Sequence, residues 1–305
     1  MLLEQLAKFY GASDVSAKMI RPGQGGASVM EATLDGQRFA LRISGPFLSA
    51  RPYWVEFEGS LLAQASGEGV LVAEAIPGVD GRYGQPFDGG LGLLTRWAEG
   101  DVEWPTPPAK AEILGRTIAQ LHRACQGMTI PKDVRPFDTA GLLDRPMALL
   151  NEVTDAEPLR PFVEEMRGRI DAIPKTQETF GPIHGDVHQG NCYFEGDHAT
   201  LFDFAQCGIG WRAFDLAGFL WPWRDHHIEK PELRAACDAY LNGYRQERLL
   251  TESEEHALPA FIRARDLWEA GEWIATGDGR EKPDEVAKGI QTWSNHWSPL
   301  QERLP

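Results

Sequence analysis

The segment from Ile183 to Asn191 constrains this chain more than any other part of it. It reads Ile-His-Gly-Asp-Val-His-Gln-Gly-Asn, and an apolar run that ends at Asp203 follows it. In a phosphoryl-transfer site, one Asp accepts the proton of the attacking hydroxyl, while an Asn and a second Asp hold Mg²⁺ against the nucleotide phosphates. The pattern therefore predicts Asp186 as the catalytic base and Asn191 and Asp203 as metal ligands, on turns between apolar runs.

The composition limits the classes of partner. The chain has 305 residues, 42% hydrophobic and 25% charged, which suggests two domains or lobes. A net charge of −15 disfavours binding to nucleic acid or to anionic lipid, and it is compatible with a cationic small molecule. No stretch approaches the roughly 18 apolar residues of a membrane span. The four cysteines lack metal-ligand spacing, so we expect reduced thiols and a cytoplasmic location.

The first hundred residues are predicted to form a strand-rich lobe. Residues 30–34 and 38–43 flank an Asp-Gly turn and read as a hairpin. Residues 55–65 read as a helix, and residues 70–76 and 92–97 read as further strands. We therefore predict a nucleotide-binding lobe over residues 1–98.

The rest of the chain, residues 99–305, is predicted to be a helical lobe that carries catalysis and acceptor binding. Apolar residues recur at helical spacing in seven segments, which are residues 109–122, 143–154, 158–172, 214–223, 231–248, 254–275 and 283–293. A cleft between two such lobes is the expected nucleotide site.

Two segments, His184–Asn191 and Phe202–Ala217, make the chain resemble the aminoglycoside phosphotransferase/choline kinase family, the bacterial phosphotransferase enzyme family. The resemblance implies an α+β, bilobal, protein-kinase-like fold, with an antiparallel sheet and a helix in the N-lobe and a mostly helical C-lobe. It implies ATP (or GTP) and Mg²⁺ as cofactors. It further implies a small-molecule hydroxyl acceptor that is aminoglycoside-, choline- or homoserine-like, and a monomer or homodimer.

The Gly-rich turn at residues 23–28 is a candidate phosphate loop. Glycine lets backbone N–H groups approach phosphates closely, so Gly25, Gly26 and Ser28 are candidate nucleotide contacts. By the same resemblance, the stretch that contains Trp97 matches the hinge that holds an adenine, and Trp97 is expected to pack on the base.

Arg42 departs from the usual kinase pattern, which has Lys on this strand to contact the phosphates and to pair with a helix Glu. Arg keeps the charge but is longer and binds through a planar fork, so it does not simply replace Lys. Glu58 is the predicted partner and Glu56 is the alternative, because the helix register is uncertain by a few residues.

Other residues have expected structural roles. His184 is expected to hold the catalytic loop through a backbone hydrogen bond, and the resemblance implies that Asp215 braces the same loop. The tryptophans near the C-terminus recur at helical spacing, which favours a place in the core over a cation-binding role; they are Trp268, Trp273, Trp293 and Trp297.

Two other functions remain open at the level of sequence. The first is a protein Ser/Thr kinase of the bacterial stress-response type, although no activation segment ending in Ala-Pro-Glu lies between Asp203 and Asp215. The second is a non-catalytic nucleotide-binding regulator. Intact Asp186, Asn191 and Asp203 count against the regulator. Arg42 and Ala205, which stands where many relatives have a second acidic residue, keep it open.

Overall fold

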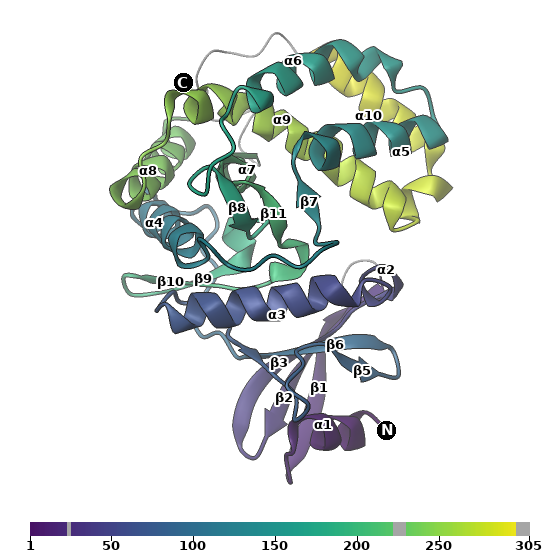
Figure 1. Cartoon of the computed structure of the whole chain (residues 1–305), viewed down its shortest axis with the longest axis vertical. Coiled ribbons are helices and arrows are strands. Elements are labelled where there is room, and N and C mark those ends of the chain that lie inside the picture. The colour runs from purple at the N-terminus through teal and green to yellow at the C-terminus, as the bar shows by residue number, and fades with distance from the viewer. Residues whose placement is uncertain (23–25, 222–229, 297–305) are drawn as a thin grey trace.

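The computed structural model describes residues 1–22, 26–221 and 230–296, and it shows two lobes stacked along the long axis of the molecule (Figure 1). The N-lobe holds a six-stranded antiparallel sheet in the order β1-β2-β3-β6-β4, with β5 paired to β6. Its strands are β1 Val15–Pro22, β2 Ser28–Leu34, β3 Gln37–Ile43, β4 Ala75–Ile76, β5 Gln85–Phe87 and β6 Gly90–Arg96. The predicted hairpin is β2-β3, and both residues of its Asp35-Gly36 turn have positive φ.

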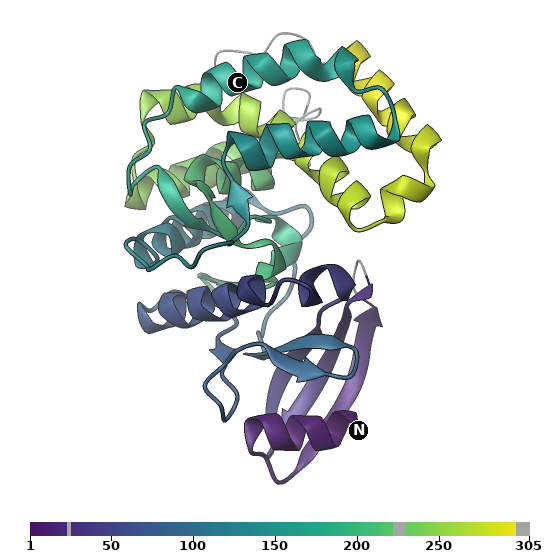
Figure 2. The ribbon, with the colours of Figure 1, turned by 45° about the vertical axis from the view of Figure 1, so that its right-hand side comes forward.

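Strand alternation decides which side chains of the N-lobe face the helical lobe. Phe39 and Leu41 are buried in a small core with helix α1 (Leu2–Tyr10). Ala40 and Arg42 alternate with them and line a cavity on the opposite face. Helix α3 (Pro52–Gly67) lies on that side, between the sheet and the helical lobe, whereas α1 lies at the far end (Figure 2). The short helix α2 (Pro46–Ser49) precedes α3.

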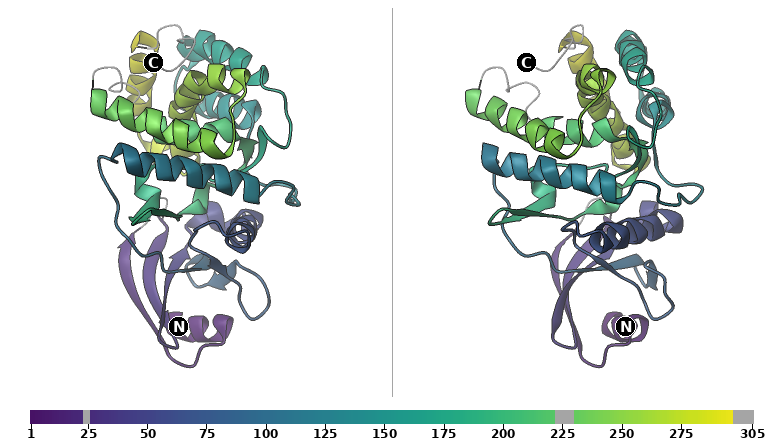
Figure 3. Two further views of the ribbon diagram at one scale, coloured as in Figure 1. Left: turned by 90° about the vertical axis from the view of Figure 1, so that its left-hand side faces the viewer. Right: turned by 60° about the vertical axis from the view of Figure 1, so that its left-hand side comes forward.

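The helical lobe is organised around α9 (Glu252–Ala275), which packs against α5, α6 and α7 (Figure 3). An N-terminal capping box, in which Thr251 and Glu254 bond each other's backbone N–H groups, fixes the start of α9. The other helices are α4 Pro108–Ala124, α5 Arg145–Val153, α6 Arg160–Asp171, α7 Arg212–Leu220, α8 Pro231–Glu247 and α10 Pro283–His296. Among the helices of the described ranges, none has the length and apolar character that crossing a bilayer requires.

Five short strands in the second lobe were not predicted from the sequence. They are β7 Pro136–Phe137, β8 Phe180–Ile183, β9 Cys192–Glu195, β10 His198–Leu201 and β11 Gly208–Trp211. Strands this short do not display a readable alternation of apolar and polar residues. They nevertheless place the loop residues of the predicted site: β8 ends just before His184, β9 begins just after Asn191, and β10 ends two residues before Asp203.

The strand predicted over residues 70–76 is wrong in its extent, because only Ala75 and Ile76 join the N-lobe sheet. Upstream, Val72 forms a bridge with Leu201, and the Ala73 N–H donates to the Leu201 carbonyl at 2.8 Å. Val72 and Ala73 therefore pair with the other lobe and not with the N-lobe sheet. The alternation of apolar and polar residues within the segment could not reveal this partner. The boundary predicted at residues 98 and 99 falls in the connection between β6 and α4, and it stays a prediction.

Candidate active site

A buried carboxylate organises the loop that carries Asp186. Asp215, on α7, accepts the backbone N–H of His184 at 2.8 Å and that of Gly185 at 2.7 Å. His122, on α4, lies 2.9 Å from the same carboxylate through Nε2. Gly185 has φ +80°, and a Cβ there would lie 2.2 Å from the carbonyl oxygen of Gln206. Only glycine fits this turn, because a side chain would meet both backbone strain and a steric clash.

The His184 ring connects the loop to the segment before Asp203. Its Nδ1 accepts the Asp186 N–H at 3.3 Å, and its Nε2 lies 3.1 Å from the Phe202 carbonyl oxygen, to which it can donate. The ring also packs on Phe204, with 4.1 Å between centroids. His184 therefore makes the backbone contact that was expected of it, and the two halves of the motif are fixed relative to each other.

Asp186 and Asn191 are in direct contact. The Asn191 amide donates to the backbone oxygen of Asp186 at 3.0 Å and to its Oδ2 at 3.2 Å. Because the amide nitrogen faces Asp186, the carbonyl oxygen of Asn191 is the atom that can bind a metal ion.

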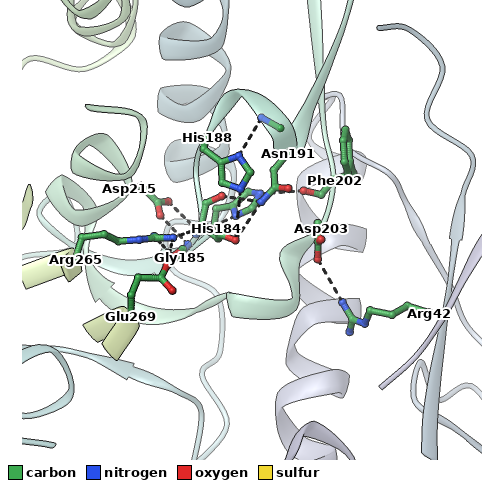
Figure 4. A network of polar contacts seen from close by, with 12 residues as sticks. Arg42, His184, Gly185, His188, Asn191, Phe202, Asp203, Asp215, Arg265 and Glu269 are labelled. Atoms are coloured by element: carbon green, nitrogen blue, oxygen red, sulfur yellow. Dashed lines mark hydrogen bonds and ion pairs between the residues drawn. The ribbon is translucent and has the colours of Figure 1, made fainter. Parts of the chain in front are cut away.

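Arg265, on α9, lies beside Gly185 and Glu269 (Figure 4), and it bonds the carboxylate oxygen of Asp186 that Asn191 does not. Its Nη2 donates to Asp186 Oδ1 and, at 2.8 Å, to Glu269, while its Nη1 donates to the Gly185 carbonyl at 2.8 Å. Burial raises the pKa of Asp186, but the charge of Arg265, aided by His188 and His184, outweighs it and leaves the pKa below the usual range for Asp. The group is therefore a carboxylate at neutral pH.

On the N-lobe side, Arg42 is paired with Glu58. Its Nη1 and Nη2 donate to the two carboxylate oxygens at 2.8 and 2.6 Å, a bidentate pair. Glu56 points elsewhere and accepts the backbone N–H groups of Tyr83 and Gly84 at 3.1 and 2.8 Å. The helix register that the sequence left open is thus resolved in favour of Glu58.

Asp203 lines a cavity between the lobes and has a left-handed conformation, with φ 58°. Non-glycine residues rarely adopt this region, and such strain concentrates at functional sites. Its carboxylate lies 4.0 Å from Arg42 Nη1 and 3.9 Å from Arg21 Nη2. A cavity of about 410 Å³ opens here, and Trp97, under the guanidinium of Arg38, lines it along with Arg21, Arg42, Glu58, Gly190 and Asp203.

The predicted phosphate loop is only partly described. Gly25 lies outside the described residues. Gly26 has φ 78°, and Ser28 opens β2 opposite Ile43. Neither Gly26 nor Ser28 lines the 410 Å³ cavity, although Ala27 between them lines a second one. The structure therefore brings Asp203, Arg42, Glu58 and Trp97 to one cavity, and it does not bring Gly26 or Ser28 there. Asp186 and Asn191 do not line this cavity, but their loop is joined to the Asp203 segment by the Phe202 N–H, which donates to the Asn191 carbonyl at 3.0 Å.

The second cavity, of about 620 Å³, lies between α2 and the helical lobe. Three tryptophans line it, namely Trp221, Trp273 and Trp293, while Trp268 is buried in the core. The core assignment is thus confirmed for Trp268, while Trp273 and Trp293 are half-buried, pack against the core and also line the cavity. Helical spacing alone does not say which face of a helix meets a cavity. Trp297 lies outside the described residues.

Sequence reasoning missed two arginines of this site. Arg265 is 79 residues from Asp186 and only 4% exposed. The available signal was an arginine among the apolar residues of a helix, beside Arg263 and Asp266, because a buried charge requires a partner. Arg21 faces Asp203 from β1, and nothing in its sequence context marks it.

Comparisons with known proteins agree with this geometry. The model of the family "Phosphotransferase enzyme family" matches residues 20–250. The chain is 33% identical over 230 residues to an uncharacterised protein of Deinococcus radiodurans, a match that covers 72% of this chain and 66% of the relative. It is 27% identical over 220 residues to a homoserine kinase of Rhodopseudomonas palustris, covering 70% of this chain and 64% of the relative. The match therefore spans less than two thirds of either relative's length.

Among solved structures, the amicoumacin kinase hAmiN in complex with AMP-PNP, Ca²⁺ and Ami superposes with a TM-score of 0.78. The sequences are 18% identical, and the match covers 99% of this chain and 95% of that one. This likeness confirms the predicted bilobal, protein-kinase-like fold. Together with the family match over residues 20–250, it shows that the chain belongs to the phosphotransferase enzyme family.

Proposed function

We propose that this protein is a kinase that transfers the γ-phosphoryl group of Mg-ATP to a hydroxyl of a small molecule, with Asp186 as the base. The observation that carries the proposal is the hydrogen-bonded pair of Asp186 and Asn191, fixed through His184 to the segment that presents Asp203. A base, a neutral oxygen ligand and an anionic ligand then meet at one end of an interlobe cleft, as phosphoryl transfer requires.

The donor set suits Mg²⁺. Asn191 offers an amide oxygen and Asp203 a carboxylate, both hard ligands, and Mg²⁺ completes its octahedron with phosphate and water oxygens. Among the described residues, no group of three or more His, Cys, Asp and Glu side chains could hold a metal ion, so a transition-metal cage is not favoured. When bound, Mg²⁺ would neutralise charge on the transferring phosphates.

The nucleotide is expected in the cavity beneath the sheet. Arg42, oriented by Glu58, and Arg21 place two positive charges beside Asp203, where phosphates would lie. Trp97 lines the same cavity and supplies an aromatic surface toward a purine. ATP is the expected donor.

The base has a limited task. The bond between the γ-phosphorus and the bridging oxygen breaks while the acceptor oxygen bonds to phosphorus, and the acceptor proton passes to Asp186. Because such transition states are loose, the carboxylate mainly positions the hydroxyl and accepts its proton late. Arg265 keeps Asp186 ionised and restricts its orientation.

The acceptor is expected in the 620 Å³ cavity. Glu269, which bonds Arg265, lines this cavity, and Arg265 in turn bonds Asp186, so the cavity adjoins the base. Its aromatic and acidic lining suits an amine-bearing alcohol. A homoserine kinase among the relatives supports a small-molecule hydroxyl as the acceptor.

The test is release of ADP from Mg-ATP against a panel of aminoglycosides, choline, ethanolamine, hydroxylated amino acids, sugars and casein-like protein. With a productive acceptor, Asp186→Asn should lower turnover by about 10²- to 10⁴-fold while Mg-ATP binding stays within about twofold, because the residue acts on the acceptor. An equal loss of nucleotide binding would show that Asp186 is not the base. Phosphate transferred only to protein would replace the small-molecule assignment.

A further inference from the structure

Arg135 is a buried charge without a counter-ion. It precedes β7, is 3% exposed, and lines the 620 Å³ cavity. Its Nε and Nη1 are buried, and within the described ranges neither makes a hydrogen bond. No carboxylate of the described residues lies within ion-pair distance of it. An uncompensated buried charge is costly, so a group in this position calls for an external partner.

The acidic residues around the cavity do not fill this role, because each is already engaged. Asp266 accepts the indole N–H of Trp221 at 2.8 Å. Glu269 accepts from Arg265 at 2.8 Å, and Glu272 accepts from Arg145. Glu285 lies 3.5 Å from Lys282. Arg135 is therefore the ionised group of the lining that has no partner among the residues that the structure describes.

Burial lowers the pKa of Arg135 to about 10, and the charge of Glu272 opposes this shift. The guanidinium is thus still protonated at neutral pH. A planar guanidinium with unpartnered N–H groups matches a carboxylate, which can accept N–H groups from one edge of the fork.

A buried acceptor lies in the same cavity lining. Gln206 Oε1 has no hydrogen-bond partner in the described part of the chain. The anionic group of a zwitterionic ligand could accept hydrogen bonds from Arg135, and its cationic group could donate one to Gln206 Oε1.

Arg135 also has a structural contact. Its guanidinium lies over the ring of Trp54, on α3, at 4.4 Å from the centroid. Stacking on Trp54 would hold the two lobes together, but it uses the face of the guanidinium and leaves its N–H edge unpaired. Arg51 lies over the same ring at 5.3 Å, so it provides a matched control for a stacking role.

We propose that Arg135 is a specificity-determining residue that binds a carboxylate of the acceptor, so that the acceptor is a zwitterionic, hydroxyl-bearing amino acid and not a simple amino alcohol. The inference rests on the proposed function for the identity of the reaction. The evidence for the binding site is the buried and unpaired guanidinium of Arg135, which does not depend on that function. It separates homoserine-like acceptors from choline-like ones and aminoglycosides, which lack a carboxylate.

The experiment uses pairs of acceptors that differ only in the carboxylate: L-homoserine and 3-aminopropan-1-ol, L-threonine and 1-aminopropan-2-ol, and L-serine and 2-aminoethanol. For the pair that is turned over best, we expect the full-length protein to favour the carboxylate member in kcat/KM by about 10- to 100-fold. Arg135→Met should bring that ratio close to one, and Arg135→Lys should retain part of it. Arg51→Met should keep the wild-type ratio, because it removes an arginine from Trp54 but not from the cavity.

The ratio within a pair is insensitive to a general loss of activity, so a poorly folded variant does not imitate the expected result. If the wild-type protein shows no preference for the carboxylate, or if the preference survives in Arg135→Met, the proposal is overturned. If no acceptor is phosphorylated, the proposed function fails, and tryptophan fluorescence titrations with the same pairs decide the inference. Binding that favours the carboxylate and is lost in Arg135→Met supports it, and absent or indifferent binding overturns it.

Discussion

Replacing Asp215 by Asn tests whether one buried carboxylate positions the catalytic loop. The carboxylate is fully buried, and it accepts three contacts: from His184 N–H at 2.8 Å, Gly185 N–H at 2.7 Å and His122 Nε2 at 2.9 Å. An Asn side chain has one acceptor oxygen. Whichever way the amide turns, its NH₂ group faces at least one of these donors.

The loss of stability follows from the number of donors that the single amide oxygen cannot accept. In the better orientation, the amide oxygen keeps His184 and His122 and loses Gly185. One charge-assisted hydrogen bond worth about 1.5–3 kcal/mol disappears, and a buried N–H is left unsatisfied at about 1–3 kcal/mol. We expect Asp215→Asn to lower the free energy of unfolding by about 3–5 kcal/mol. Turnover should fall by more than tenfold under conditions where the variant is folded, because Asp186 follows Gly185 directly.

The assay is urea unfolding followed by tryptophan fluorescence, with amide hydrogen exchange at Gly185 as a local readout. Asp238→Asn is the matched control, because it makes the same chemical change on the exposed face of α8, where Asp238 lies 4.0 Å from Arg234. That variant should stay within about 0.5 kcal/mol of wild type. If Asp215→Asn behaves like this control and exchange at Gly185 is unchanged, the loop is held by other contacts and the reasoning is refuted.

Three further changes address the metal, the nucleotide and the pH dependence. Asp203→Ala should remove the Mg²⁺-dependent part of ATP affinity in a fluorescent-nucleotide titration, and full retention would place the metal elsewhere. Arg42→Lys replaces the planar guanidinium by a single ammonium group, so it should weaken ATP binding by about 3- to 10-fold in the same titration. An unchanged affinity would mean that the bidentate pair with Glu58 is not needed for ATP binding. Burial lowers the pKa of His122 to about 4, against contacts with Asp215 that raise it. Below pH 6.5 the unfolded chain therefore binds a proton that the folded one excludes, and stability should fall by about 1.4 kcal/mol per pH unit down to pH 4. When the free energy of unfolding is measured at a series of acidic pH values, the His122→Gln variant should lack the part of the pH slope that one proton contributes. An identical slope in the variant would contradict the assignment of this pH dependence to His122.

Local sequence was sufficient for the elements whose signals are short-range. The Asp35-Gly36 turn predicts its hairpin because both residues tolerate positive φ, and the long helices follow from apolar spacing. Asp186 and Asn191 could be identified because they lie on one loop, five residues apart in the chain. Their expected roles depend on spacing that the sequence displays directly.

Other parts of the site depend on contacts between distant segments. The choice of Glu58 over Glu56 required the register of α3 against β3, which is set by packing. Arg265 reaches Asp186 across 79 residues, and no local pattern carries such a contact. The short strands that flank the loops are stabilised by their neighbours and not by their own sequence.

The division between sequence and tertiary structure is sharpest at the two cavities. The chain by itself determined the reaction class to be expected, because the polar residues of phosphoryl transfer lie close together along it and their chemistry is local. Only the tertiary structure decided what surrounds them: that Trp273 faces a cavity while Trp268 is buried, and that Arg135 is enclosed without a counter-ion. Burial and unpaired charge are properties of the whole packed molecule, since they depend on which distant side chains exclude water from a given atom.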